Sequence, residues 1–257
     1  MSGTVFVGSA DAYERFMGRY SRQLATPFAD FAGLQSGMRV LDVGAGTGAL
    51  TEELIARVGA KFVSAAEPSP DYTAALRARY PDVDVRRVPA EELPWDDGSF
   101  DVTLAQLVVS FMSDAHQGAR ELARVLRPGG VAAACMWELD GMDMMNAMRE
   151  VRRQLQPDEE PASATAFRSE QSLRELFEGA GMTDVETTVV EVFVTYASVE
   201  ELWEPAIRVG GPGGPAVDRF SVEQLERGRA IFVAALGSPT GSFTLGGRAA
   251  AVRGVRP

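Results

Sequence analysis

Three glycines and a distant carboxylate are the residues of this sequence best suited to hold a ligand. Gly44, Gly46 and Gly48 follow the apolar run 40–43, and Glu67 lies nineteen residues after Gly48, at the end of a second apolar run. Glycine adopts positive φ without cost and lets a ligand approach the backbone. A carboxylate can accept two hydrogen bonds from a ribose diol. The spacing therefore predicts a site for the sugar of a nucleoside.

A parallel sheet is the element that would bring these residues together. Between residues 39 and 138, short apolar runs alternate with amphipathic segments, which is typical of βαβ units. Because the carboxyl ends of parallel strands meet at one edge, the glycine turn and Glu67 should lie side by side. We predict strands at 40–43, 62–66, 83–88, 100–106 and 131–138, helices at 49–58, 71–80 and 115–126, and a turn at 127–130.

After residue 138 the pattern is less regular. Helices are predicted near 142–155, 169–180 and 222–236, and two long β-branched runs at 185–196 and 242–252 suggest an antiparallel hairpin at the sheet edge. The fold class expected is α/β, a doubly wound Rossmann-like, mostly parallel seven-stranded sheet with a C-terminal antiparallel hairpin and helical cap insertions. We expect a single domain, 1–257, divided into an N-terminal helical cap (1–38), a cofactor-binding core (39–138), cap or insertion segments (139–168 and 198–236) and a C-terminal part that completes the sheet (169–257).

Composition narrows the classes of protein to consider. With 257 residues, of which 46% are hydrophobic, the chain can bury one substantial core. A net charge of −11 gives no overall attraction for nucleic acid, which we do not expect as a partner. No apolar run approaches the roughly 18 residues of a membrane span, so no membrane partner is expected and the predicted location is the cytoplasm. Cys135 and His116 are single, which excludes an intrachain disulfide and a zinc cluster, and no metal is expected.

The glycine segment resembles motif I of the class I S-adenosylmethionine-dependent methyltransferases, Val-Leu-Asp-Val-Gly-x-Gly-x-Gly, at residues 40–48. Its spacing differs from the Gly-x-Gly-x-x-Gly fingerprint of dinucleotide sites. Further segments match the family in order, especially its branch of small-molecule and quinone methyltransferases. They are 89–101 after the third strand, 121–130 at the entry to the fifth strand, and 13–21, which looks like the N-terminal helical cap of that branch.

The resemblance implies S-adenosylmethionine as the cofactor and assigns each part of it to residues of this chain. The turn Gly44, Ala45 and Gly46 would approach it, and Glu67 would hold the ribose. Pro68 and Ser69 would flank the adenine on one side, with Ala90 and Glu91 beside it. Gln106 would line the methionine part, and Arg19 would pair with its carboxylate. Asp42 is expected to brace the turn rather than to touch the ligand.

Methyl transfer is an in-line displacement, so the protein contributes mainly position. No catalytic residue is assigned. Glu138 is the best candidate for a base by location, whereas His116 lies on what looks like an outer helix face and Cys135 lies in a buried strand. The methionines at 142, 144, 145 and 148 are expected to pack a helix rather than to line a pocket. For Trp137 and Trp203, the sequence does not decide between contact with the methyl acceptor and packing in the core.

The acceptor expected is a small organic molecule, and a homodimer is left open. Two other functions stay open at this point. One is a non-catalytic S-adenosylmethionine-binding sensor or subunit, which the missing base allows. The other is a nicotinamide oxidoreductase, which the glycine turn and the acidic residue about 20 positions later allow, although the glycine spacing disfavours it.

Overall fold

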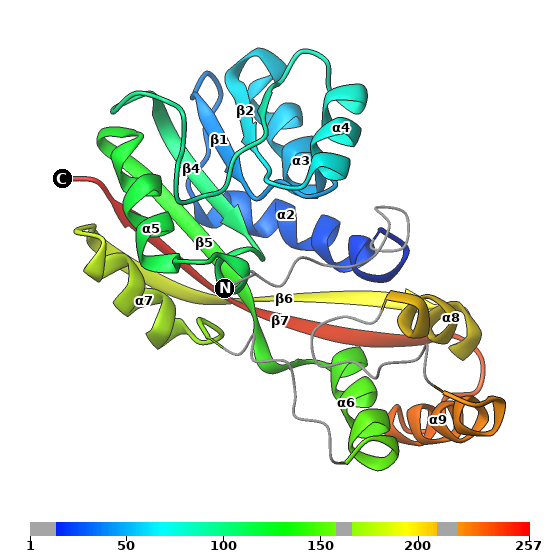
Figure 1. The fold of residues 1–257 in the computed structure, drawn as a ribbon. Coiled ribbons are helices and arrows are strands. Elements are labelled where there is room, and N and C mark those ends of the chain that lie inside the picture. Colours follow the sequence, from blue (N-terminus) through cyan, green and yellow to red (C-terminus); the bar gives the residue numbers. More distant parts are fainter. Residues whose placement is uncertain (1–13, 158–165, 210–219) are drawn as a thin grey trace.

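A computed structural model of the chain describes residues 14–157, 166–209 and 220–257 (Figure 1). Residues 1–13, 158–165 and 210–219, which belong to the predicted cap segments, lie outside the described part. The strands are β1 (Val40–Val43), β2 (Val63–Ala66), β3 (Asp84–Arg86), β4 (Phe100–Gln106), β5 (Leu126–Met142), β6 (Thr183–Tyr196) and β7 (Phe243–Val255). The helices are η1 (Glu14–Gly18), α2 (Arg19–Phe31), α3 (Ala49–Val58), η2 (Ala60–Phe62), α4 (Pro70–Arg79), η3 (Val109–Phe111), α5 (Ala115–Arg124), α6 (Asp143–Leu155), α7 (Glu170–Gly179), α8 (Val199–Val209) and α9 (Val222–Ala235).

The strands form one seven-stranded sheet in the order β3-β2-β1-β4-β5-β7-β6. The first five of these pair in parallel, and β7 pairs antiparallel with both β5 and β6. The chain order reverses between β1 and β4, the kind of switch point where open α/β sheets bind ligands beyond their strand ends. The predicted mostly parallel seven-stranded sheet with a C-terminal antiparallel hairpin is confirmed.

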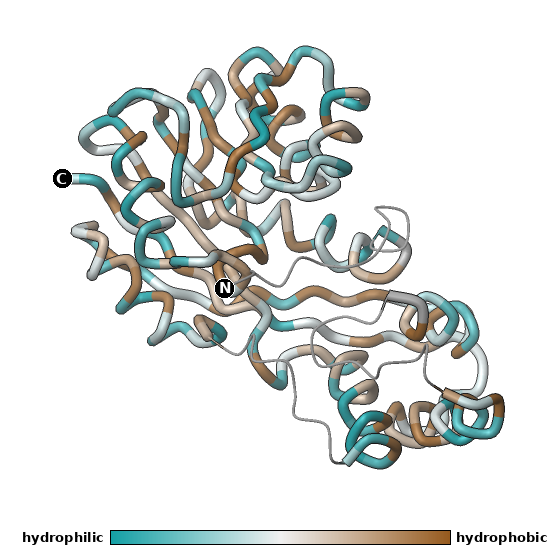
Figure 2. The backbone as a smooth tube through the Cα atoms, in the orientation of Figure 1, coloured by the Kyte–Doolittle hydropathy of each residue, from teal (hydrophilic) through white to brown (hydrophobic). Residues whose placement is uncertain are grey.

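Helices cover both faces of the sheet, as in a doubly wound fold. One apolar cluster contains Leu24 of α2 and Leu54 of α3 with the strand residue Leu104, and a second contains Leu122 of α5 and Phe177 of α7. Burial of apolar surface at roughly 25 cal/mol per Å² makes these two layers the main source of stability. Figure 2 shows the apolar residues gathered in the strands and the hydrophilic ones on the outer turns of α6.

The last three strands are longer than the parallel ones and run past them. Figure 1 shows α6, α8 and α9 gathered at this extension, on the opposite end from α4. Ring contact between Trp203 of α8 and Phe232 of α9, with centroids 5.2 Å apart, joins two of these helices. The predicted methionine packing is found here, since Met142, Met144 and Met148 are buried in the apolar core.

Most predicted boundaries differ from the structure by a few residues, and the largest difference is at the start of β5. The helix predicted to end at residue 126 ends at Arg124, and β5 begins at Leu126, so the predicted turn 127–130 lies inside a strand. The backbone explains this, because Gly129 N donates to Arg256 O and Arg256 N donates to Gly130 O, at 2.8 and 2.9 Å. The pairing partner comes from the far end of the chain and leaves no local signal in the sequence.

No helix in the described ranges combines the length and the apolar character that crossing a bilayer requires.

Candidate functional site

A pocket of about 470 Å³ opens where β1, β2 and β4 end, at the switch point of the sheet. Its wall contains nine of the ten residues predicted to bind the cofactor: Gly44, Ala45, Gly46, Glu67, Pro68, Ser69, Ala90, Glu91 and Gln106. These residues come from the ends of four strands, β1 to β4, and lie up to 62 positions apart in the sequence, from residue 44 to residue 106. The parallel sheet therefore gathers them as expected.

The glycine turn has the backbone conformation that its sequence suggested. Gly44, Gly46 and Gly48 all have positive φ, at 72°, 57° and 92°. A Cβ on Gly44 would meet the side chain of Val108 at 2.4 Å, a distance that real Cβ atoms do not show. The amides of Gly44 and Ala45 both donate to Ala66 O, at 2.8 and 3.2 Å, which fastens the turn to the end of β2.

Glu67 holds the turn from the opposite side. Its side chain is buried, with 5% exposed, and its Oε2 accepts from Gly46 N and its Oε1 from Ser69 N, both at 2.8 Å. Burial raises the pKa of the Glu67 carboxyl, and the two backbone amides oppose that shift. Each oxygen keeps a second lone pair, so the carboxylate can still accept from a diol.

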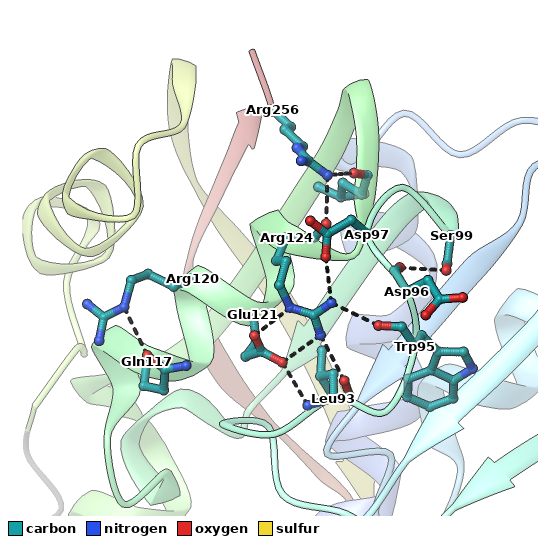
Figure 3. Close-up of polar contacts among 11 residues, drawn as sticks. Leu93, Trp95, Asp96, Asp97, Ser99, Gln117, Arg120, Glu121, Arg124 and Arg256 are labelled. Carbon is teal, nitrogen blue, oxygen red and sulfur yellow. Dashed lines mark hydrogen bonds and ion pairs between the residues drawn. The ribbon is translucent and has the colours of Figure 1, made fainter.

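Ala90 and Glu91 lie on the loop that follows β3, and Arg124 of α5 braces this loop (Figure 3). Arg124 donates to the carbonyls of Leu93 and Trp95 and to the carboxylates of Asp97 and Glu121, over 2.7 to 2.9 Å. Glu121 in turn accepts from Leu93 N at 2.8 Å. The network joins α5 to the loop at several points, which makes it a rigid support for the side of the pocket that Ala90 and Glu91 form.

The floor of the pocket contains two acceptor atoms without a donor. Asp42 on β1 is 1% exposed; its Oδ2 accepts from Thr51 Oγ1 at 2.6 Å, whereas its Oδ1 has no hydrogen-bond partner. Gln106 at the end of β4 donates through Nε2 to Ser21 O at 3.0 Å, and its Oε1 has no partner. Buried polar atoms are nearly always paired, so these two call for a ligand donor.

The charges in the pocket wall are all acidic. Asp42, Glu67 and Glu91 line it, and no arginine, lysine or histidine of the described ranges does. The glycine spacing differs from the dinucleotide fingerprint, and the carboxylates of this wall add nothing to the binding of a pyrophosphate. A nucleoside with a sulfonium and an ammonium group fits the same charges, because opposite charges attract more strongly where water is excluded.

Arg19 is the predicted cofactor residue that the structure does not bring to the pocket. Its side chain is 43% exposed, forms an ion pair with Glu201 of α8, and lies 5.3 Å from the ring centre of Tyr196. Successive residues of a helix point about 100° apart, so Arg19 points away where Tyr20 and Ser21 point inward. Ser21 is the residue of α2 that lines the pocket.

The other candidates for chemistry lie outside the pocket wall. Glu138 pairs with Arg248 at 3.3 Å, and His116 packs edge-on against Phe167 with ring centres 5.9 Å apart. Cys135 is fully buried, and burial raises the pKa of its thiol. Trp137 and Trp203 are both buried in the core. Within the described ranges, no group of three or more His, Cys, Asp or Glu side chains is placed to hold a metal ion.

Several residues of the wall were not predicted. They form an apolar side made by the segment after β4: Leu107, Val108, Phe111 and Met112. Leu107 has a φ of 61°, rare for a residue with a side chain, and its amide donates to Cys135 O at 2.9 Å. An apolar run beyond a strand end looks like ordinary core in a sequence, so only the polar part of the wall gave a signal.

Comparison with known proteins agrees with this geometry. The family model described as "Methyltransferase domain" matches residues 41–134, which include β1 to β4, the glycine turn and Glu67. A demethylmenaquinone methyltransferase of Chlorobaculum tepidum is 37% identical over 110 residues, 43% of this chain and 43% of that protein. The chain thus matches less than half the length of this relative.

Solved structures are similar over nearly the whole chain. The YcgJ protein of Bacillus subtilis covers 93% of this chain and 98% of its own, with a TM-score of 0.56 and 16% identity. A Haemonchus contortus phosphoethanolamine N-methyltransferase 2, solved with S-adenosylhomocysteine, covers 96% of this chain and 57% of its own, with a TM-score of 0.59 and 18% identity. Residues 41–134 therefore match the methyltransferase domain, and the chain that carries them has the fold of these solved structures, one of which is a methyltransferase.

Proposed function

We propose that this protein transfers the methyl group of S-adenosylmethionine to a small organic acceptor. The observation that carries the proposal is the composition of one pocket, in which the glycine turn and Glu67 meet a wall whose charges are all negative. Such a wall suits a cationic nucleoside and not a dinucleotide, which disfavours the nicotinamide oxidoreductase.

The residues fit the cofactor part by part. Glu67 would accept from the ribose hydroxyls, and Pro68, Ser69, Ala90 and Glu91 would enclose the adenine. Asp42 and Gln106 offer unpaired acceptor atoms for the amino acid end. When bound, S-adenosylmethionine supplies a methyl group already activated by the sulfonium.

The apolar side of the pocket explains how the chain would support the transfer. Leu107, Val108, Phe111 and Met112 exclude water from the region beyond Gln106 and restrict where an acceptor atom can lie. Alignment of this kind is worth effective molarities of about 10⁵ M or more, without a catalytic base. We place the acceptor among small organic molecules because the similar demethylmenaquinone methyltransferase is named for one. We propose that segments 139–168 and 198–236, with the N-terminal cap 1–38, provide the acceptor's contacts.

Calorimetry with S-adenosylhomocysteine tests the cofactor assignment. We expect saturable binding by the folded protein, and Glu67→Ala should weaken it by about thirty-fold, since two hydrogen bonds to a buried carboxylate are worth about 2 kcal/mol. Glu92→Ala is the matched control, because Glu92 lies on the loop after β3, next to Glu91 of the pocket wall, but is itself exposed and outside that wall. An unchanged affinity of the Glu67 variant would remove this residue from the site.

Turnover is a separate question. Release of S-adenosylhomocysteine from S-adenosylmethionine in the presence of a panel of phenols, quinols, amines and carboxylic acids would support the enzyme. Binding of NADH, followed by fluorescence, together with failure to bind S-adenosylhomocysteine, would contradict the proposal.

A further inference from the structure

Three buried aromatic side chains outside the pocket wall carry polar atoms without a partner. Tyr20 of α2, Trp137 of β5 and Tyr196 of β6, which we call the aromatic cluster, are 0%, 7% and 2% exposed. Among the described residues, neither phenol oxygen nor the indole nitrogen Nε1 has a hydrogen-bond partner. Buried polar atoms are nearly always paired, so three unpaired ones in a single cluster indicate a missing ligand.

The members of the aromatic cluster lie together on one face of the sheet. The rings of Tyr20 and Trp137 meet edge-on, with centroids 6.2 Å apart. Both pack on Gly247 of β7, where an added Cβ would lie 3.2 Å from the Tyr20 ring and 3.3 Å from the Trp137 ring. Burial, and after it the neighbouring Tyr196, raises the pKa of Tyr20. The sheet and α2 thus hold the three polar groups in one place.

The aromatic cluster adjoins the pocket. Tyr20 precedes Ser21, which lines the pocket and whose carbonyl accepts from Gln106 Nε2 at 3.0 Å. Gln106 of β4 is aligned with Cys135 of β5, and Trp137 lies two residues further along β5, on the same face. Neighbouring strands are about 4.8 Å apart and two residues of a strand span about 6.6 Å, which places the Cα atoms of Gln106 and Trp137 roughly 8 Å apart. An acceptor molecule beside Gln106 can therefore reach the cluster.

The charges near the aromatic cluster are of both signs. Burial has the largest effect on Tyr20 and Tyr196 and raises the pKa of each, so both hydroxyls stay protonated and can donate. Arg19, 5.3 Å from the centre of the Tyr196 ring, lowers the pKa of both tyrosines. Asp143 raises the pKa of Tyr20, and Glu201, the ion-pair partner of Arg19, raises that of Tyr196. Hydrogen-bond donors among balanced charges suit an uncharged ligand group.

We propose that the aromatic cluster recognises the methyl acceptor by an uncharged oxygen atom, the hydroxyl or carbonyl of a phenol, quinol or ketone. This rests on the proposed function. An indole N–H only donates and a phenol donates or accepts, so the cluster has three hydrogens to give. A ligand oxygen with two lone pairs accepts two of them, and the third serves a bond between the tyrosines. An ammonium group would instead meet an indole that cannot accept from it.

The rest of such an acceptor matches the apolar side of the pocket. That side consists of Leu107, Val108, Phe111 and Met112. An apolar ring held there, with its oxygen fixed by the aromatic cluster, has one orientation toward the cofactor. Tyr20, Trp137 and Tyr196 are therefore specificity-determining residues and do not take part in the transfer itself.

The experiment measures how three probes of similar shape bind to the full chain saturated with S-adenosylhomocysteine. The probes are 1-naphthol, naphthalene and 1-naphthoate, and equilibrium dialysis at pH 7 gives their affinities. We expect 1-naphthol to bind at least about fivefold more tightly than naphthalene, the effect of one net hydrogen bond. We expect 1-naphthoate to bind no more tightly than naphthalene, because a buried charge without a cation is costly.

Variants assign the effect to the aromatic cluster. Tyr20→Phe and Trp137→Phe each remove one polar atom and should each weaken 1-naphthol binding about fivefold, while the affinities for naphthalene and S-adenosylhomocysteine stay unchanged. Tyr80→Phe is the matched control, because the Tyr80 hydroxyl is also buried without a partner but its ring packs on Gly48, outside the cluster and the pocket wall. This control should bind 1-naphthol like the wild type.

Thermal denaturation of the unliganded variants separates a ligand site from closed packing. An unpaired hydroxyl adds nothing to stability, so Tyr20→Phe should melt at the wild-type temperature or above it. A lower melting temperature would mean that Tyr196 or a trapped water already pairs this hydroxyl, and it would overturn the inference. Equal affinities for 1-naphthol and naphthalene, tighter binding of 1-naphthoate, or unchanged 1-naphthol binding by Tyr20→Phe would overturn it too, with the cofactor assignment left standing. Failure of S-adenosylhomocysteine to bind would overturn both.

Discussion

Two buried carboxylates, Asp42 in the pocket wall and Glu121 against the loop after β3, differ in how well they are paired. Glu121, 9% exposed, accepts from Arg124 with both oxygens and from Leu93 N with one, and Arg124 holds its pKa below the ordinary value. Asp42, 1% exposed, has no donor for its Oδ1 among the described residues, and burial raises its pKa to about 7. The paired carboxylate supports the loop that carries Ala90 and Glu91, whereas the unpaired one faces the pocket. The difference teaches that an incomplete hydrogen-bond set marks where a ligand is needed.

Arg124→Met is expected to have the largest effect on the free energy of unfolding. This change leaves Glu121 without its cation and frees three carbonyl or carboxylate partners on the loop (Figure 3). The free energy of unfolding should fall by about 3 kcal/mol, as for other partly buried charge networks. Urea denaturation at pH 7 measures it. Arg120→Met is the control, because Arg120 is exposed and its described partner is Gln117 on its own helix, and it should change stability by less than about 0.5 kcal/mol.

Glu121→Gln keeps the shape of the side chain but removes its charge. We expect it to lower the free energy of unfolding by about 2 kcal/mol at pH 7, a smaller loss than for Arg124→Met. The pKa of Glu121 is lowered in the folded state, so its contribution is present above its ordinary value of 4.5 and is lost as the pH falls through the folded value. The difference between variant and wild type should therefore shrink toward pH 3. A difference that does not change with pH would mean that the charge of Glu121 adds nothing.

Asp42→Asn should raise the free energy of unfolding instead of lowering it, and by the smallest amount of the three variants. The folded pKa of about 7 lies above the ordinary 3.8, so the stability that Asp42 contributes is fully present at low pH and is lost as the pH rises from about 4 to about 7. At pH 8 the variant should be about 1 kcal/mol more stable than the wild type, after the cost of its own unpaired amide. At pH 4 this advantage should vanish. Thermal or urea denaturation at both pH values checks it, and a loss of stability at pH 8 would contradict the comparison.

The parts of the site that follow from local sequence could be predicted. The glycine turn and Glu67 are specified by residues next to strands, and the sheet brings them together as expected. The direction of Arg19 could not be predicted, because it depends on which face of α2 packs on the sheet. The extension of β5 over Pro128–Gly130 could not be predicted either, because its hydrogen-bond partner is Arg256, far away in the sequence. The lack of a donor for Asp42 Oδ1 could not be predicted either, because it depends on which residues of β2, β4 and α3 lie next to it.

The position of β7 has a consequence for how the molecule assembles. β7 lies between β5 and β6, so β6 contacts the rest of the sheet only through a strand that is synthesised some sixty residues after it. During translation the parallel strands can pair first. β6 is synthesised before β7, so it has no strand to pair with until β7 has been made. The parallel half of the sheet can therefore form before β6 is paired, and the emergence of β7 decides when the β-branched surface of β6 is covered.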